Sequence, residues 1–455
     1  MGSSGSTHWL RIPEDVDALV PALWPSGVSK VDGVLTVAGL TAVELAAEYG
    51  TPTYVIDEID FRERARAFRD AFGGVGADVF YAGKAFLCVA VARWIAEEGL
   101  NLDVCTGGEL AVALRAEFPP ARIAMHGNNK SVPELRRALE AGVGRIVVDS
   151  LDEIDRLAKL TAELGTTAAV LIRVTPGVEA HTHEYIATAH EDQKFGFSIA
   201  GGAAMEAVRR VVDVANLTLL GLHSHIGSQI FDTDGFDVAT RRVLGLHAEI
   251  KTELGLELPE LDLGGGFGVA YTTGDDPSTP KQLAAGMRTI VEAECDALGI
   301  AIPRLSVEPG RAIAGPSTFT LYEVGTVKEV ELDGGANRRY VSVDGGMSDN
   351  IRPALYGADY SCTLASRPSS AEPVLSRVVG KHCESGDVVV YDEFLPADTR
   401  PGDLLAVPVT GAYCRSLAST YNHVPRAAVV AVRAGESRVI LRRETEADLL
   451  ALDEG

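Results

Sequence analysis

The chain has 455 residues, of which 46% are hydrophobic and 23% are charged, a composition typical of a folded globular protein with two domains. The net charge of −23 argues against nucleic acid or an anionic membrane surface as a partner. No apolar run is long enough to span a bilayer and no signal segment opens the chain, where residues 1–6 resemble an expression-tag remnant. The six cysteines lack a zinc-binding spacing, which predicts free thiols in a cytoplasmic protein.

The first 57 residues form an N-terminal segment of mixed character. We expect residues 8–40 to be irregular, apart from a possible strand at 33–38. Thr41-Ala42-Val43-Glu44 is a capping box that predicts a helix ending at Gly50, and residues 53–56 are typical of a strand. We assign residues 1–57 to a β domain that the C-terminal part of the chain completes.

Residues 58–310 alternate between short apolar strands and amphipathic helices, beginning with a helix at 59–72. Eight strands are predicted, at 79–82, 101–104, 122–126, 145–148, 168–174, 217–223, 260–263 and 304–307. Helical segments separate them. This count and length predict a parallel (β/α)8 barrel of the TIM type. A doubly wound open sheet is the alternative, because strand counting does not exclude it.

Residues 311–455 have a different pattern, in which strand-like runs are separated by Gly, Pro and Asp turns. The predicted strands lie at 318–330, 339–343, 387–391, 404–409, 427–432 and 438–441. We expect an all-β domain of sandwich or barrel-like form, with its most loop-like stretch at 366–373.

Lys84 follows the first barrel strand directly, in Tyr81-Ala82-Gly83-Lys84-Ala85. A lysine at this position suits a pocket, where desolvation lowers the pKa of the amine and allows it to form a Schiff base with an aldehyde. The alternative is a structural lysine paired with a carboxylate.

Three other polar segments end barrel strands, and active sites of such barrels lie at the carboxyl ends of the strands. Gly264, Gly265 and Gly266 follow the seventh strand and suit a phosphate cradle, to which Ser228 can add a hydroxyl. His225 can lie against an aromatic cofactor, with a core histidine as the alternative. Glu308 can hold a pyridinium nitrogen, with a salt bridge to Arg311 as the alternative. Together with Lys84 these residues describe a pyridoxal phosphate site.

The motifs that carry this site resemble those of the fold-type III pyridoxal phosphate decarboxylases. They are Tyr81-Ala82-Gly83-Lys84-Ala85, His225-Ile226-Gly227-Ser228, Gly264-Gly265-Gly266 and Glu308-Pro309-Gly310-Arg311. Three segments of the β domain resemble the meso-diaminopimelate decarboxylase branch of that family. They are Val343-Asp344-Gly345-Gly346-Met347-Ser348-Asp349-Asn350-Ile351-Arg352-Pro353-Ala354-Leu355-Tyr356, Cys383-Glu384-Ser385-Gly386-Asp387 and Gly411-Ala412-Tyr413.

The resemblance implies pyridoxal 5′-phosphate as cofactor and decarboxylation of meso-diaminopimelate to L-lysine, the last step of lysine biosynthesis. Lys84 is implied to carry the cofactor and Cys383 to reprotonate the substrate carbon. The implied cofactor-binding residues are Lys84, His225, Ser228, Gly264, Gly265, Gly266, Glu308, Gly310, Arg311 and Tyr413. The implied substrate-binding residues are Arg311, Arg352, Tyr356, Glu384 and Tyr413.

In the family, the residues that match Cys383 and Glu384 reach the partner subunit's site, which implies a homodimer with shared sites. The alternatives are a buried structural thiol for Cys383 and a surface arginine for Arg352. We expect no metal, because His181 and His183 form a lone pair without carboxylate spacing.

Four rival functions stay open. An ornithine or arginine decarboxylase of the same fold needs a negative group for a distal cation, whereas Arg311, Arg352 and Tyr356 favour a distal carboxylate. A carboxynorspermidine decarboxylase is a rival that is harder to distinguish. A catalytically inactive regulator and a barrel racemase fit less well with Lys84, Glu308 and Cys383 in place.

Overall fold

The computed structural model describes residues 9–177, 194–331 and 337–455, so that His181 and His183 lie outside the described residues. The chain divides into two compact units. The first, here called the β unit, contains residues 1–63, 269–276 and 313–455. The second, here called the barrel unit, contains residues 64–268 and 277–312.

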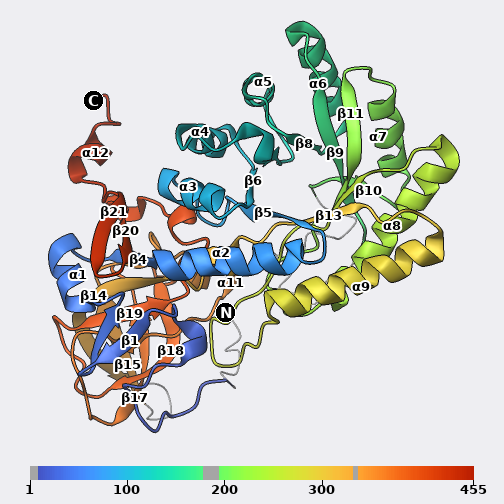
Figure 1. The fold of residues 1–455 in the computed structure, drawn as a ribbon. Coiled ribbons are helices and arrows are strands. Elements are labelled where there is room, and N and C mark those ends of the chain that lie inside the picture. The colour runs from blue at the N-terminus through green and yellow to red at the C-terminus, as the bar shows by residue number, and fades with distance from the viewer. Residues whose placement is uncertain (1–8, 178–193, 332–336) are drawn as a thin grey trace. The chain divides into compact units, whose positions relative to one another are not determined.

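The strands of the barrel unit pair in parallel and close on themselves (Figure 1). They are β5 (Asp78–Ala82), β6 (Asn101–Val104), β7 (Ile123–Met125), β8 (Arg145–Val148), β9 (Ala168–Thr175), β11 (Leu217–His223), β12 (Glu260–Asp262) and β13 (Arg304–Val307). The short β10 (Phe197–Ser198) extends β9. Because β13 pairs with β5, the predicted eight-stranded barrel is confirmed and the open sheet is wrong.

Helices connect these strands, as the alternating pattern predicted. They are α2 (Glu58–Gly73), α3 (Val89–Glu97), α4 (Gly107–Arg115), α5 (Val132–Ala141), α6 (Leu151–Leu164), α7 (Ala203–Val212), α8 (Asp234–Leu254), α9 (Pro280–Leu298) and α10 (Arg311–Ala314), with the 3-10 turn η2 (Pro120–Arg122). Phe68 and Phe72 of α2 pack against Phe267, which also stacks on Phe236 of α8. The apolar face of the helix at 59–72 therefore packs in the core.

The β unit contains a nine-stranded sheet and a separate three-stranded sheet. The larger sheet comprises β4 (Thr53–Asp57), β14 (Thr318–Glu331), β15 (Asn337–Val343), β16 (Thr363–Leu364), β17 (Pro373–Val379), β18 (Val388–Pro396), β19 (Leu404–Pro408), β20 (Ala428–Arg433) and β21 (Glu436–Leu441). β4 pairs with both β14 and β20, which confirms that an N-terminal strand completes the β domain.

The smaller sheet corrects the expectation that residues 8–40 are mostly irregular. It comprises β1 (Val28–Val31), β2 (Val34–Val37) and β3 (Leu40–Thr41). Asp32 and Gly33 join β1 to β2 with φ of 50° and 77°, the conformation of a tight hairpin turn. β17 was also not predicted; it is defined by pairing with β15 and β18, which lie far from it in the sequence or across a turn.

The remaining elements are short. They are η1 (Pro21–Leu23), α1 (Ala42–Tyr49), α11 (Arg352–Tyr356), η3 (Arg415–Leu417), η4 (Tyr421–His423) and α12 (Glu446–Leu450). The capping box at Thr41 and Glu44 is present, and α1 ends at Gly50 as predicted. Within the described ranges, no helix combines the length and the apolar character that crossing a membrane requires.

Candidate active site

Lys84 lies in a tight turn two residues after β5 and is partly buried. Gly83 N donates to the carbonyl of Asp103, and a Cβ on Gly83 would stand 2.8 Å from that oxygen. This close approach fixes the turn against β6. The positive charge of Lys84 acts on the carboxyls of Asp103, Glu109 and Glu308, whose pKa values it lowers against the opposing effect of burial.

The glycine run after β12 forms a turn that other residues cannot adopt. Gly264 and Gly266 have φ of 69° and 107°, and a Cβ on Gly265 would stand 2.2 Å from the carbonyl of Glu308. Gly265 N donates to Nδ1 of His225 at 3.1 Å. Burial lowers the pKa of His225 well below its usual value, so its imidazole is neutral. The turn therefore positions His225, while Gly264 N donates to Asp262 Oδ1 at 2.8 Å, and its glycines keep side chains out of the space that an anion would need.

Arg311 and Ser228 meet beside this turn. Arg311, the first residue of α10, is buried and donates to Ser228 Oγ at 2.6 Å. A Cβ on Gly310 would stand 2.8 Å from the carbonyl of Ala82, so the loop after β13 passes directly over the end of β5. The predicted residues Lys84, His225, Ser228, Gly264, Gly265, Gly266, Glu308, Gly310 and Arg311 all lie at the carboxyl ends of strands in the barrel unit.

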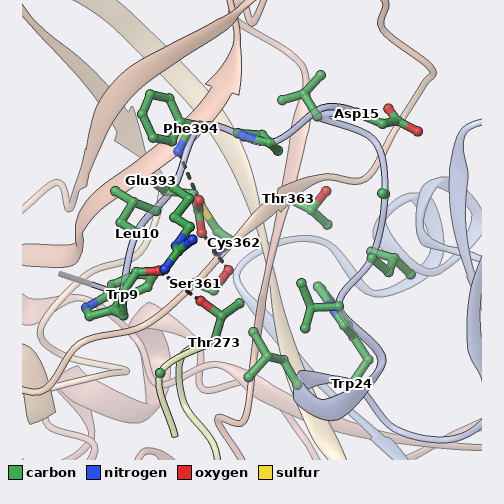
Figure 2. Close-up of a pocket in the computed structure, with 18 residues that line it drawn as sticks. Trp9, Leu10, Asp15, Trp24, Thr273, Ser361, Cys362, Thr363, Glu393 and Phe394 are labelled. Carbon is green, nitrogen blue, oxygen red and sulfur yellow. Dashed lines mark hydrogen bonds between the residues drawn. The ribbon is translucent and has the colours of Figure 1, made fainter. Parts of the chain in front are cut away.

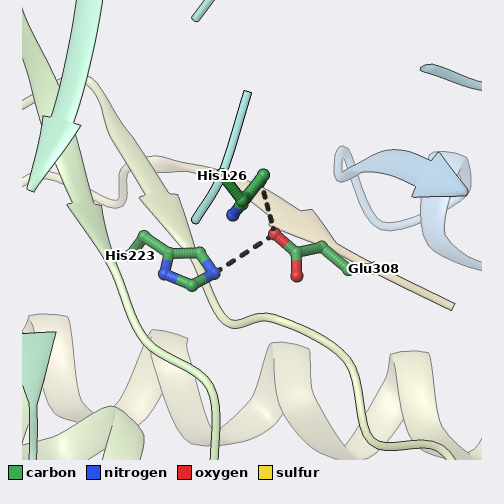
Figure 3. A group of neighbouring side chains, drawn as sticks. All are labelled: His126, His223 and Glu308. Carbon is green, nitrogen blue, oxygen red and sulfur yellow. Dashed lines mark ion pairs between the residues drawn. The ribbon is translucent and has the colours of Figure 1, made fainter. Parts of the chain in front are cut away.

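Glu308 lies against two histidines in the interior of the barrel (Figure 3). Its Oε1 is 3.2 Å from Nε2 of His126 and 3.2 Å from Nε2 of His223. The two imidazole rings make an edge contact with centroids 4.9 Å apart. His126 also lies 3.6 Å from Asp103.

The titration of this centre is strongly perturbed by burial. Burial raises the pKa of Glu308 to about 7 and that of Asp262 to about 7, and it raises the pKa of Asp103 well above its usual value. It lowers the pKa of His223 to about 3 and that of His126 well below its usual range. Perturbed groups gathered at one end of a barrel are characteristic of an active site.

The same trio has the composition of a metal site, since its ligand atoms lie within 4.8 Å of one another. Two positive charges disfavour a cation there, because both Lys84 and Arg173 act electrostatically on the two histidines and lower their pKa values.

Arg352 occupies the first position of α11 in the β unit and is 4% exposed, so the surface-arginine alternative is wrong. Its guanidinium lies 4.4 Å from the ring centre of Tyr271 and donates to Tyr360 Oη at 2.5 Å. Within the described ranges no acidic side chain pairs with Arg352, and its Nε has no hydrogen-bond partner. A buried guanidinium of this kind suits a carboxylate ligand. Tyr356, at the end of α11, is partly buried.

Cys383 and Glu384 are exposed on a turn of the β unit, so the buried-thiol alternative for Cys383 is wrong. Cys383 N donates to Asn422 Oδ1 at 2.9 Å. Asp387 accepts from the backbone and Nδ1 of His382, at 2.8 and 2.7 Å. These contacts hold an accessible thiol and carboxylate in one defined turn.

Tyr413 is partly buried and has a φ of 61°, which is uncommon for an aromatic residue. Two residues earlier the backbone is closely packed, since a Cβ on Gly411 would stand 1.8 Å from the carbonyl of Ala314.

A cavity of about 610 Å³ lies in the β unit, apart from every predicted site residue (Figure 2). Trp9, Trp24 and Phe394 line it together with Glu393. Burial raises the pKa of Glu393, whose carboxylate accepts from Ser361 Oγ at 2.5 Å and from Phe394 N at 2.9 Å. The main polar group of this cavity, the Glu393 carboxylate, is thus already hydrogen-bonded.

Sequence reasoning did not assign His126, His223, Asp103, Asp262 or Arg173. The available signal was position, because His126 and His223 end or follow predicted barrel strands. Their convergence on Glu308 depends on the closure of the barrel, which brings β7, β11 and β13 around one interior.

Known proteins with similar sequences and structures agree with this geometry. The family model of the pyridoxal-dependent decarboxylases, for their pyridoxal binding domain, matches residues 58–315. The chain is 61% identical over 440 residues to the diaminopimelate decarboxylase of Mycobacterium tuberculosis H37Rv, across 96% of this chain and 98% of that protein. It is 47% identical over 423 residues to the diaminopimelate decarboxylase of Bacillus subtilis 168, across 92% and 95%.

The fold is also similar to a solved structure. The diaminopimelate decarboxylase from M. jannaschii in complex with L-lysine matches with a TM-score of 0.88 and 32% identity, across 95% of this chain and 98% of that one. The chain therefore belongs to the pyridoxal-dependent decarboxylases, in the branch formed by the diaminopimelate decarboxylases.

Proposed function

We propose that the chain decarboxylates meso-2,6-diaminopimelate to L-lysine and carbon dioxide with pyridoxal 5′-phosphate, as the last step of lysine biosynthesis. Relatives named for diaminopimelate decarboxylation support the activity. In the chain itself, the choice of substrate rests on Arg352. Its guanidinium is buried and has no acidic partner among the described residues. Ornithine and arginine have a distal cation, whereas diaminopimelate has a distal carboxylate that this group can bind.

The residues of the barrel unit fit the cofactor. The glycine turn has no room for side chains, and the hydroxyl of Ser228 suits a phosphate, as does Tyr413 by resemblance. When bound, pyridoxal phosphate supplies an electron sink for the pair of electrons left by carbon dioxide. Lys84 would supply the amine that holds the cofactor aldehyde and later releases the product, and Glu308 would hold a proton at the ring nitrogen. His225 would lie against the ring.

The proposed substrate contacts follow from the chemistry of each side chain. Arg352 binds the distal carboxylate with its planar fork of N–H donors, assisted by Arg311 and Tyr356. Glu384 binds the distal ammonium. The thiol of Cys383 donates a proton to the carbon that has lost carbon dioxide.

We further infer that the enzyme is a cytoplasmic homodimer in which Cys383 and Glu384 act in the partner's site. Their exposure on a firmly held turn supports this inference, because a thiol and a carboxylate displayed together suit a neighbouring subunit better than their own core. All six cysteines are free thiols, in agreement with a reducing compartment.

The test is to incubate the purified chain and pyridoxal phosphate separately with meso-diaminopimelate, ornithine, arginine and carboxynorspermidine, and to measure carbon dioxide and the amine product. We expect lysine from diaminopimelate and no product from the other three. Turnover of ornithine or arginine would contradict the substrate assignment. Bound cofactor without turnover of any substrate would favour an inactive regulator.

Arg352 is tested within the same assay. Arg352→Leu should reduce kcat/KM for diaminopimelate on the order of 100-fold, the value of a charged hydrogen bond in a dry site. Arg339→Leu is the matched control, because Arg339 is also buried in the β unit but donates to the carbonyls of Pro396 and Thr399. An equal loss of kcat/KM in both variants would assign Arg352 to folding alone.

A further inference from the structure

We propose that His126 and His223 are positioning residues, which hold the Glu308 carboxylate as two uncharged donors so that it stays ionised toward the cofactor's ring nitrogen. The inference rests on the proposed function of Glu308 at that nitrogen. It adds His126 and His223 to the site. Neither is proposed to contact the reacting carbon of the substrate, and the sequence motifs gave neither a role.

The first support is convergence. His223 ends β11, His126 follows β7 and Glu308 follows β13, and no two of these strands are neighbours in the barrel. Both Nε2 atoms nevertheless lie 3.2 Å from the same oxygen, Oε1 of Glu308 (Figure 3). Side chains from three separate strands thus meet at one atom of Glu308, whose carboxyl group also has a side-chain hydrogen bond with Asp262.

The second support is burial without hydrogen bonds. Nε2 of His126, both ring nitrogens of His223 and Oε1 of Glu308 are shielded from solvent, and none of them makes a hydrogen bond to the residues that the structure describes. The two 3.2 Å contacts with Oε1 are ion-pair distances that do not meet hydrogen-bond geometry. Polar atoms buried in this way are costly unless they interact. The two imidazoles and Oε1 are therefore each other's available partners.

The third support is charge. Glu308 is surrounded by Asp103 from β6, Asp262 from β12, Lys84 after β5 and Arg173 from β9, while Asp149 after β8 and Lys130 after β7 act on the histidines. Burial and the two nearest cations lower the pKa of each histidine, which keeps both neutral. A neutral N–H donor favours the ionised form of a carboxyl without cancelling its charge.

An ionised Glu308 needs this support. Burial raises the pKa of Glu308 to about 7 with both histidines in place, so the carboxyl is close to half protonated near neutral pH, and losing a donor would raise this pKa further. A protonated Glu308 cannot hold the ring nitrogen in its cationic form. A histidinium would be equally unsuitable, because its own charge would neutralise the carboxylate.

The test is a spectroscopic pH titration of the holoenzyme variants His126→Leu, His223→Leu, His126→Gln and His223→Gln. Glutamine keeps an N–H donor near the position of Nε2, whereas leucine fills the space without one. The matched control is His247→Leu, since His247 of α8 is also buried, has its pKa lowered to about 4 by burial, and has no partner at Nε2 among the described residues. The absorbance of the bound cofactor and the kcat profile are followed from pH 5.5 to 9.

We expect each leucine variant to move the acidic limb of both profiles upward by about one pH unit, the effect of losing one hydrogen bond to a charged group. The glutamine variants and His247→Leu should titrate like the wild type, and activity of the leucine variants should recover at high pH. If a leucine variant does not fold, the glutamine variant decides: a wild-type titration supports the proposal and a shifted one overturns it.

Leucine variants that titrate like His247→Leu would overturn the proposal, as would glutamine variants that shift as far as leucine. A wild-type chain that binds no pyridoxal phosphate would overturn the proposed function and this inference together. A wild type that turns over diaminopimelate with unshifted leucine variants would overturn the inference alone.

Discussion

Two lysines follow strands of the same barrel, Lys84 after β5 and Lys130 after β7, and their surroundings differ. Lys130, five residues after β7, is 1% exposed and pairs with Glu153 at 2.8 Å, while its Nζ donates to the carbonyls of Gly127 and Val147. Its ammonium is thus enclosed by three oxygens. Such a lysine is fully used by the fold.

Lys84 is only partly buried and acts on several carboxyls at once, including Asp103 and Glu308, whose pKa values burial raises. Lys84 therefore lies among titratable groups with shifted pKa values, whereas Lys130 is enclosed by three oxygens. The difference shows that burial alone does not identify a reactive lysine. The titratable groups around each lysine distinguish the two.

The largest effect is expected from removing the amine of Lys84. Lys84→Ala should reduce decarboxylation by roughly three orders of magnitude or more, because the amine that holds the cofactor is lost. Carbon dioxide release and the cofactor's absorbance band are the measurements. A variant with near wild-type turnover would remove Lys84 from its proposed role.

The converse change at Lys130 should affect stability rather than chemistry. Lys130→Met leaves Glu153 as an unpaired buried charge, which should lower the free energy of unfolding by about 3–5 kcal/mol. Urea denaturation measures it. The double variant Lys130→Met/Glu153→Leu is the control and should recover much of the loss. A single variant as stable as the wild type would show that the pair is not essential to the fold.

The stability of the apoprotein is also expected to depend on pH, through the buried carboxyls near Lys84. The folded-state pKa of Asp262 and that of Glu308 are raised to about 7, so between pH 4 and 7 the folded chain binds more protons there than the unfolded chain. Their contribution to stability is present at low pH and is lost as the pH rises through about 7, by up to about 1.4 kcal/mol per pH unit for each group.

The measurement is the difference in unfolding free energy between the wild type and Asp262→Asn across this range. We expect the wild type to lose stability more steeply with rising pH than the variant. Parallel curves would show that Asp262 titrates as an ordinary carboxyl.

The smallest effect concerns the helix start beside Lys130. Ser131 caps α5 in a capping box with Glu134, so Ser131→Ala should lower the free energy of unfolding by about 1 kcal/mol. Turnover should be unchanged, because the cap supports the structural lysine and not the site. Chemical denaturation and the decarboxylation assay are the two measurements, and a loss of turnover at full stability would contradict this separation.

Much of the barrel was predictable from the sequence, for a physical reason. Parallel strands buried on both faces read as short continuous apolar runs, such as residues 79–82 and 146–148, and glycine or capping residues mark their ends. β1 and β17 were missed because neither is an apolar run. Each is defined by its partners, through a hairpin at Asp32 and Gly33 or through pairing with β15 and β18.

The sequence by itself determined which residues stand at the ends of the barrel strands, because local patterns of apolar residues and glycines fix strand boundaries. Lys84, Gly264 and Glu308 could be identified in this way. Only the tertiary structure decided that Glu308 meets His126 and His223, and that Arg352 is buried with no counter-ion among the residues that the structure describes. Those facts depend on contacts between segments more than 80 residues apart or on burial of a single side chain, which no local pattern encodes.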